Sequence, residues 1–430
     1  MINTFSDTLK DSGIEWIGQI PNEWKVTKIG QIYDERNEKV SDKDYPPLSV
    51  TKNGVVPQLE TAAKTDNGDN RKLVRINDFV INSRSDRRGS CGISEYEGSV
   101  SLINTVLSPR NNMCNKYYNY TFKSECFADE FYKWGNGIVD DLWSTKWSSM
   151  KNIYIPFPEI EEQKKIADYL DDKCNKIDNI IETEKAVIER LKEYKQSLIT
   201  ESVTKGSNKS ITLKNSNIKW IGEIPEHWKV LRIKNVAWLK GRIGWQGLKS
   251  DEYQDTGAYL ITGTDFDNGR INWDTCVHIS QERFEEAPEI HIKENDLLIT
   301  KDGTVGKVAL AINCPQDVSL NSGVLLIRNT KDIKYHSKYL YYMLLSDVFW
   351  QWFNSNLNGN STIIHLYQEQ FYDFSFCYPP IDEQEQIANY LDKKCTEIDK
   401  AIEDKEQVIE KFAEYKKSLI YECVTGKKRI

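Results

Sequence analysis

Cationic side chains able to bind phosphate groups or base edges gather in the stretch "DFVINSRSDRRGSCGISEY", which begins at residue 78. The cations in question are Arg84, Arg87 and Arg88. An arginine can hold guanine O6 and N7 with two hydrogen bonds, and both arginine and lysine bind phosphates. We therefore take the three arginines as candidate nucleic-acid contacts.

A related stretch, "DLLITKDGTVGKVALAI", begins at residue 296 and carries Lys301, Thr304 and Lys307. It is predicted to form strand, tight turn and strand, because Asp302-Gly303 is typical of a two-residue hairpin turn. The glycines of the two stretches align, and the first tip is four residues longer. Solvated charges on an exposed turn are the alternative. Basic residues at the same position in both stretches favour contact with DNA.

A third candidate is the glycine-rich stretch "LKGRIGWQGLKSDEY" at 239–253, which contains Arg242, Trp245 and Gln246. Glutamine can pair with adenine, tryptophan can stack on an exposed base, and glycines allow close backbone approach. The alternative is a tryptophan that anchors a loop in the core. Nothing in the first half of the chain matches this stretch, so any role belongs to the second half.

Residues for catalysis or metal binding are not found in the required patterns. The strings "YPPL" at 45–48 and "YPPI" at 378–381 lack the Asn or Asp that an adenine methyltransferase places before the two prolines, and no Gly-x-Gly-x-x-Gly occurs. No acidic triad with lysine suggests a nuclease. The nine cysteines form no Cys-x-x-Cys pair and the five histidines are scattered, so we expect no zinc and mostly reduced, buried thiols.

These candidates lie within an internal duplication of the 430-residue chain. "WIGQIPNEWKVTKI" at 16–29 recurs as "WIGEIPEHWKVLRI" at 220–233, and "PEIEEQKKIADYLDDKCNKID" from 158 recurs as "PPIDEQEQIANYLDKKCTEID" from 379. Identical tryptophans cannot discriminate between two targets. We therefore predict a structural role for the four tryptophans Trp16, Trp24, Trp220 and Trp228 at the junction between a globular domain, or head, and the helix that follows it. Docking of another subunit is the alternative.

The regions between the repeated phrases are related but diverged. "NDFVINSR" at 77–84 aligns with "NDLLITKD" at 295–302, and "SLINTVLSPRN" at 101–111 aligns with "SLNSGVLLIRN" at 319–329. Outside these strand-like runs little matches. The sequence therefore predicts two related mixed α/β heads.

Each head is followed by a predicted helix of roughly 45 residues with apolar residues every 3.5 positions on average, the pattern of a coiled-coil seam. The predicted seam positions are Leu170, Cys174, Ile177, Ile181, Glu184, Ile188, Leu191, Lys195 and Leu198 in the first helix, and Leu391, Cys395, Ile398, Ile402, Lys405, Ile409, Phe412, Lys416 and Leu419 in the second. Proline precedes and glycine (Gly206, Gly426) follows each helix, as helix ends prefer.

The central charged positions of the two seams, Glu184 and Lys405, are of opposite sign. Antiparallel and parallel pairing both bring them together, so this pair does not choose the direction. Antiparallel helices would place the two heads at opposite ends, as two separated targets require. We therefore predict an antiparallel pair with Glu184 and Lys405 in contact.

Charge is distributed unevenly. The net charge is −8, whereas nucleic-acid binders are usually basic. Segment 159–205 holds 12 acidic and 9 basic residues, and segment 382–429 holds 12 and 10, so the helices supply −5 of the −8. Basic surfaces on the heads must therefore be local.

Two diverged heads, each followed by a helix that starts Pro-x-Ile-x-E-Q-x-x-I-A-x-Y-L-D, resemble the specificity subunit of type I restriction–modification systems. The Trp-Ile-Gly-x-Ile-Pro-x-x-Trp phrase is also typical of that family, and the "LKGRIGWQG" phrase recurs in its target recognition domains. The resemblance covers essentially the whole chain. It implies an α+β fold in which two mixed α/β target recognition domains are separated by a pair of long antiparallel coiled-coil helices with internal pseudo-two-fold repetition.

The resemblance further implies that this chain is not an enzyme. It would read an asymmetric bipartite site in double-stranded DNA and bind two modification subunits, which methylate adenine, and restriction subunits, which cut DNA. S-adenosylmethionine, ATP and magnesium would belong to those partners, and this chain would hold no cofactor or metal. The sequence contains no signal peptide or apolar run of membrane-spanning length, so we expect a cytoplasmic protein.

The predicted organisation has six parts: 1–24 repeated segment, 25–155 first target recognition domain, 156–206 first spacer helix, 207–229 linker and repeated segment, 230–378 second target recognition domain, and 379–430 second spacer helix. A coiled-coil adaptor that binds only proteins is the competing interpretation. Diverged heads with basic hairpins argue against it.

Overall fold

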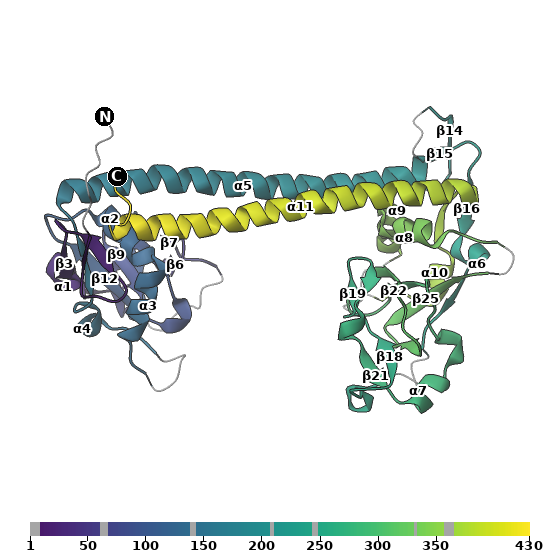
Figure 1. Cartoon of the computed structure of the whole chain (residues 1–430), viewed down its shortest axis with the longest axis horizontal. Helices are drawn as coiled ribbons and strands as arrows, with labels where there is room; N and C mark the ends of the chain where they lie inside the picture. The colour runs from purple at the N-terminus through teal and green to yellow at the C-terminus, as the bar shows by residue number, and fades with distance from the viewer. Residues whose placement is uncertain are drawn as a thin grey trace. The chain divides into compact units, whose positions relative to one another are not determined.

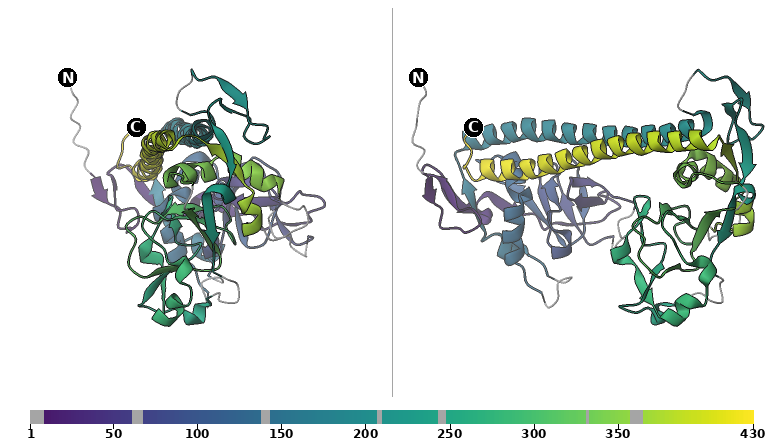
Figure 2. Two further views of the ribbon diagram at one scale, coloured as in Figure 1. Left: turned by 90° about the vertical axis from the view of Figure 1, so that its right-hand side faces the viewer. Right: turned by 45° about the vertical axis from the view of Figure 1, so that its right-hand side comes forward.

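The computed structural model describes residues 9–60, 68–137, 143–206, 210–242, 248–330, 333–356 and 365–430. The chain forms two compact units, Met1–Lys185 with Glu406–Ile430, and Ala186–Lys405. Each unit contains one globular head and a part of both long helices, α5 (Ile160–Lys205) and α11 (Ile381–Val424). Figures 1 and 2 show the course of the elements in each unit.

The head of the first unit is built on small antiparallel sheets. Its strands are β1 (Leu9–Asp11), β2 (Gln19–Pro21), β3 (Lys25–Lys28), β4 (Tyr33–Glu35), β5 (Lys39–Val40), β6 (Leu48–Thr51), β7 (Gly54–Pro57), β8 (Arg71–Val74), β9 (Phe79–Asn82), β10 (Cys91–Ile93), β11 (Gly98–Val100), β12 (Asn104–Pro109) and β13 (Tyr154–Phe157). Its short helices are α1 (Ile29–Ile32), α2 (Asn115–Lys123), α3 (Glu125–Lys133) and α4 (Trp147–Met150).

The head of the second unit has larger sheets. Its strands are β14 (Leu213–Asn215), β15 (Glu223–Pro225), β16 (Lys229–Arg232), β17 (Ala237–Lys240), β18 (Ala258–Ile261), β19 (Phe266–Asp267), β20 (Arg270–Ile271), β21 (Val277–Ile279), β22 (Leu297–Thr300), β23 (Val308–Leu310), β24 (Val318–Leu320), β25 (Val324–Asn329) and β26 (Ser375–Tyr378). Its short helices are α6 (Ile233–Val236), α7 (Gln281–Glu285), α8 (Ser337–Leu345), α9 (Asp347–Ser355) and α10 (Gln368–Tyr372).

The two heads share a four-stranded antiparallel core. Its order is β10-β9-β12-β4 in the first head and β23-β22-β25-β17 in the second, where β20 and β19 extend the sheet further. The strand-like runs that align in sequence become β9 and β22, and β12 and β25. The strand register corrects two details of the sequence alignment. Ile81 lies opposite Cys91 and Ile299 opposite Val308, so the first tip is one residue longer than the second and not four as predicted. Asn82 lies opposite Asn104 and Thr300 opposite Val324, so β12 and β25 are shifted by two residues from the alignment of 101–111 with 319–329. The repeated α+β architecture predicted from the sequence is confirmed.

The long helices pack antiparallel in both units. In the first unit, Leu170 and Cys174 near the start of α5 share a core with Leu419 and Cys423 near the end of α11. In the second unit the opposite ends meet, since Leu198 and Ile199 of α5 share a core with Leu391, Cys395 and Ile398 of α11. The predicted direction of the helix pair is therefore correct.

The seam lysines form ion pairs within each unit. Lys416 Nζ lies 2.6 Å from Asp178 Oδ1, and Lys195 Nζ lies 2.6 Å from Asp399 Oδ2. These aspartates lie beside the seam on the opposite helix, so each lysine keeps its stem in the seam and its charge at the edge. Glu184 belongs to the first unit and Lys405 to the second, and their pairing stays a prediction.

Each head is attached to the helices through its second repeated tryptophan. Trp24 and Trp228 are each 1% exposed. Trp24 Nε1 donates to Glu162 Oε2 at 2.9 Å, and Trp228 Nε1 donates to Glu383 Oε2 at the same distance. The two glutamates begin the E-Q-x-x-I-A motif of each helix, so the Trp phrase and the helix start are repeated together because they bind each other.

The glutamine that follows each glutamate holds the head's helical layer. Gln163 Oε1 accepts a hydrogen bond from the Cys114 backbone N at 2.8 Å, and Gln384 Oε1 accepts one from the His336 backbone N at 2.9 Å. Both glutamines are fully buried. Each fixes the residue that precedes α2 or α8, so the orientation of that helix is set directly by the long helix.

A repeated Lys-Tyr-x-x-Tyr motif in α2 and α8, which was not predicted from the sequence, completes the attachment. Tyr120 Oη donates to Asp171 at 2.7 Å, and Tyr342 Oη donates to Asp392 at 2.8 Å. The tyrosine three residues earlier reaches the far end of the other long helix: Tyr117 Oη donates to the Val424 carbonyl at 2.7 Å. The shared spacing from Lys116 and Lys338 was the available signal.

The glycine after α11 offers a test of this junction. Gly426 has φ +73°, and a Cβ there would collide with Pro21 and lie 3.1 Å from Trp24. Gly18, in the same unit, has φ +67° but its nearest neighbour would be the flexible Lys427 Nζ at 3.6 Å. We expect Gly18→Ala to cost about 1 kcal/mol from backbone strain alone, and Gly426→Ala to cost a further 1–3 kcal/mol or so from overpacking. Urea unfolding measures both, and equal losses would contradict the proposed packing.

The predicted Glu184–Lys405 pair is tested by charge reversal. Glu184→Lys and Lys405→Glu should each lower the free energy of unfolding, because each puts two like charges together in the seam. The double variant should regain most of the loss, with a coupling of roughly 0.5 kcal/mol that shrinks at high salt. Additive losses in the double variant would show that the two side chains do not meet.

Candidate nucleic-acid interface

The three candidate arginines of the first head lie on the connection between β9 and β10. This connection contains a 3-10 turn, Ser85–Arg87, followed by Gly89 at φ +75°. All three arginines are exposed. The predicted basic tip is therefore present, and its three arginines are accessible to solvent.

The arginines differ in their neighbours. Arg87 Nε lies 3.4 Å from Asp86, and Arg88 forms an ion pair with Asp129. Among the described residues, Arg84 has no ion-pair partner. Its charge is the least neutralised of the three, so it has the most to gain from an anionic ligand.

Arg84 lines a groove of 620 Å³ together with Lys72, Lys146, Trp147 and Lys151. Lys72 is paired with Glu35 at 3.2 Å. Lys146 and Lys151 are exposed and, within the described parts of the chain, have no carboxylate partner. The groove, which we call the Arg84 groove, is therefore cationic and has an aromatic wall, which suits a phosphate backbone and bases.

Three of these groove residues, Lys146, Trp147 and Lys151, were not among the contacts predicted from the sequence. They belong to "WSTKWSSMK" at 143–151, where lysines alternate with tryptophans. Such alternation of basic and aromatic residues is itself a signal for nucleic-acid binding. Short helix α4 positions them, with Lys146 at its N-cap and Lys151 at its C-cap.

A second groove, of 550 Å³, lies on the other side of the turn after β11 and is lined by Lys52, Arg71, Asp86 and Arg87. We call it the Arg87 groove. Arg71 is only 5% exposed, and its Nε donates to Ser99 Oγ at 2.8 Å. Arg71 is therefore a buried cation at the wall of the groove, whereas Lys52 and Arg87 are exposed.

The corresponding connection in the second head joins β22 to β23 and is longer than predicted. Thr300 N donates to the Lys307 carbonyl at 2.9 Å, which leaves six residues between the paired positions. The prediction of a two-residue turn at Asp302-Gly303 is therefore wrong. The Thr300 hydroxyl binds the Thr304 carbonyl inside the loop. Gly303 does take a positive φ of 67°, as its sequence context indicated, but within this wider loop.

The predicted contacts on this connection are unequally available. Thr304 is exposed, whereas Lys301 and Lys307 are half-buried. Lys307 Nζ donates to the Gly263 carbonyl at 3.3 Å and lines a 500 Å³ cleft that also contains Arg270. The structure therefore brings Lys307 together with Arg270, which was not a candidate from the sequence.

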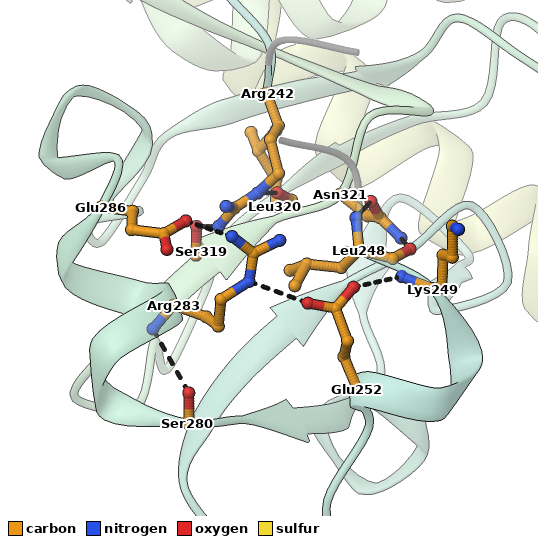
Figure 3. Close-up of polar contacts among 10 residues, drawn as sticks. All are labelled: Arg242, Leu248, Lys249, Glu252, Ser280, Arg283, Glu286, Ser319, Leu320 and Asn321. Atoms are coloured by element: carbon orange, nitrogen blue, oxygen red, sulfur yellow. Dashed lines mark hydrogen bonds and ion pairs between the residues drawn. The ribbon is translucent and has the colours of Figure 1, made fainter. Parts of the chain in front are cut away.

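Arg242 is a correction to the predicted surface contacts. It is 2% exposed, its Nε donates to the Leu320 carbonyl at 3.1 Å, and a terminal nitrogen donates to Ser319 Oγ at 2.9 Å (Figure 3). Burial, and then the nearby Arg283, lowers the pKa of Arg242. The guanidinium braces the strand end inside the head. Trp245 and Gln246 lie outside the described residues.

Arg242 and Leu248 are both held at the end of β24. Leu248 N donates to Asn321 Oδ1 at 3.4 Å, and Asn321 Nδ2 donates to the Leu248 carbonyl at 3.3 Å (Figure 3). Beside it, Arg283 pairs with Glu252 at 2.9 Å. Arg242 and Leu248 are therefore fixed on consecutive residues of the β24 end, which makes their role structural.

With this geometry in place, comparison with known proteins decides the family. Residues 21–190 and 225–411 match the family model of the type I restriction modification DNA specificity domain. The chain belongs to this family. The two matched segments each contain one head and a long-helix segment, in agreement with the duplication.

Curated relatives of the specificity family span almost the whole chain. The MjaVIII specificity subunit of Methanocaldococcus jannaschii is 26% identical, with 96% of this chain and 94% of the relative covered. The putative MjaX specificity subunit of the same organism is 25% identical, with 96% of each covered. The sequence prediction of a non-catalytic specificity subunit with DNA target recognition domains is confirmed.

Solved structures show the same fold. One is a chain from a structural study of complex assembly and conformational transition in the type I R-M system. It matches with a TM-score of 0.72 and 13% identity, and the match covers 95% of this chain and 99% of that chain. Another is the HsdS subunit of Thermoanaerobacter tengcongensis, with a TM-score of 0.54, 14% identity, and 95% and 98% covered. No described helix of this specificity-family member is long and apolar enough to cross a membrane.

The exposed arginines of the first head should serve DNA binding and not folding. In a complex with a modification subunit, changing Arg84, Arg87 and Arg88 to alanine should weaken DNA binding and reduce the slope of log K against log salt by about 0.9 for each phosphate that the variant no longer neutralises. The melting temperature should barely change, since exposed charges contribute little to stability. Arg110→Ala is the matched control, because Arg110 is exposed and paired with Asp34 but lines neither groove. A salt slope equal to that of the control would leave the three arginines as solvated surface charges.

Proposed function

We propose that this specificity subunit reads an asymmetric bipartite site in double-stranded DNA, one half-site with each head. The proposal rests on one observation: the same contacts attach both heads to the long helices, whereas the exposed surfaces of the two heads differ. Trp24–Glu162 and Trp228–Glu383 hold the two heads in the same way, while the residues exposed above the shared core sheet differ.

The difference between the heads supports recognition of unlike half-sites. In the first head, Arg84, Lys146 and Lys151 line one groove. In the second head Thr304 is exposed, and Lys307 and Arg270 line a separate cleft. Cationic grooves of different shape and composition suit different sequences, because phosphate contacts position DNA and the remaining side chains read base edges.

The long helices fit the role of a spacer. The two helices pack antiparallel in both units. Each unit contains one ion pair between the helices, Asp178–Lys416 in the first and Asp399–Lys195 in the second. A spacer of fixed length sets the separation of half-sites, as dimer geometry does in other DNA-binding proteins. The excess acidic charge of the helices keeps DNA on the heads.

The proposal includes partners. Two modification subunits would bind this chain and methylate adenine in each half-site, and restriction subunits would join them for cleavage. S-adenosylmethionine, ATP and magnesium would be held by those subunits, and the assembly would work in the cytoplasm. The assembly described for the structural relative, a type I R-M system, supports association with such subunits.

Head exchange tests the two-head proposal. The chain is co-expressed with a modification subunit, and the methylated motif is determined by sequencing of modified bases. Replacing residues 230–378 with the second head of another family member should change one half of the motif only. Replacing 25–155 in the same way is the matched variant and should change the other half. A change of both halves by either exchange would refute one head for each half-site.

A further inference from the structure

We propose that Leu102 and Ile103 of the first head form an apolar ridge that contacts DNA bases, while the cations on both sides hold the phosphates. The inference rests on the proposed function, since it requires DNA on the first head. It assigns a base-reading role to two residues that were not among the DNA contacts predicted from the sequence. Both residues lie on the turn between β11 and β12.

The ridge is exposed and central. Leu102 and Ile103 are each 42% exposed, a large fraction for two consecutive apolar side chains. Leu102 lines the Arg84 groove, and Ile103 lines both the Arg84 groove and the Arg87 groove. Ile103 is therefore the divider between two cationic grooves. Neither side chain contributes fully to the head's core, so folding does not explain its apolar character.

The turn that carries the ridge is held firmly. Asn104 N donates to the Ser101 carbonyl at 3.1 Å, and Asn104 Nδ2 donates to the same carbonyl at 3.2 Å and to Ser101 Oγ at 3.1 Å. The Ile103 carbonyl accepts a hydrogen bond from Ser83 N at 3.1 Å. The last bond ties the ridge to the residue beside Arg84, so the apolar and cationic groups keep a fixed relative position. A preformed arrangement loses little conformational entropy when a ligand binds.

Charge selects DNA as the occupant. Arg84, Lys146 and Lys151 flank the ridge in one groove, and Lys52 and Arg87 flank it in the other. Cations on two sides of a narrow apolar element match a duplex groove, where two phosphate strands border the base edges. Apolar side chains contact thymine methyl groups in the major groove or unstack base steps from the minor groove. A protein surface would not require cations on both sides.

The second head lacks this feature, although it has the same turn. Asn82 lies opposite Asn104 as Thr300 lies opposite Val324, and Ser83 N donates to the Ile103 carbonyl as Lys301 N donates to the Gly323 carbonyl. The residues that correspond to Leu102 and Ile103 are therefore Ser322 and Gly323. The position that is an open apolar ridge in one head carries a hydroxyl group and a glycine in the other. Such a difference is what two heads for unlike half-sites need.

The test compares the double variant Leu102→Ala/Ile103→Ala with Ile76→Ala in the complex with a modification subunit. Ile76 is 65% exposed on the same head but lines neither groove, so it controls for loss of exposed apolar surface. The double variant should bind the target duplex roughly tenfold more weakly. Its salt slope and melting temperature should match those of the wild type, because every cation that holds a phosphate is still present. Its methylated motif should relax at a position in the first half only.

Other outcomes are equally informative. An unchanged affinity and motif in the double variant, with a normal motif in the wild type, would overturn the ridge and leave the two-head proposal standing. A failure of the wild-type complex to methylate any bipartite motif would overturn the two-head proposal itself. Loss of the modification subunit from the double variant in size-exclusion chromatography would show that the ridge binds protein and refute the role in base reading.

Discussion

The indole–carboxylate bond at the start of each long helix is the interaction on which the structure depends. Trp24 is buried against the helix that follows its own head, and its ring lies beside Gly426, just after the end of the other helix. The same indole therefore touches both members of the helix pair. A DNA-reading surface can diverge freely above this junction, because the contacts that orient the head lie beneath the core sheet.

Much of the architecture could be predicted because repetition exposes it. A phrase that recurs with its tryptophans and a helix start that recurs with Glu162 and Glu383 indicated two heads and two helices, and the seam spacing predicted helices of the right length. Tyr117, which binds the Val424 carbonyl, and Tyr339, whose Oη donates to the Val203 carbonyl at 3.1 Å, were missed as anchors. Their neighbours in the sequence differ, so the short motif does not stand out without the contacts it makes.

The interface was less predictable, since exposure depends on tertiary packing. A basic residue in a glycine-rich phrase can face solvent or brace the interior, and Arg242 braces the interior because Ser319 and the Leu320 carbonyl lie within reach. Asp302-Gly303 indicated a turn, but local residue preferences do not set loop length once the Thr300 hydroxyl binds within the loop. Lys146 and Lys151 are distant in sequence from Arg84, and only the fold brings them together.

The first compact unit is assembled from segments far apart in the chain, since Glu406–Ile430 packs with Met1–Lys185. Tyr117 in the first head binds the carbonyl of Val424, and Leu419 and Cys423 are buried in the same core. During synthesis at about 5–20 residues per second, the first head therefore waits on the order of tens of seconds for its final core residues. Its completion also requires contacts of very long sequence separation, which form slowly. The first head and the helix pair can therefore finish folding only after α11 has been synthesised.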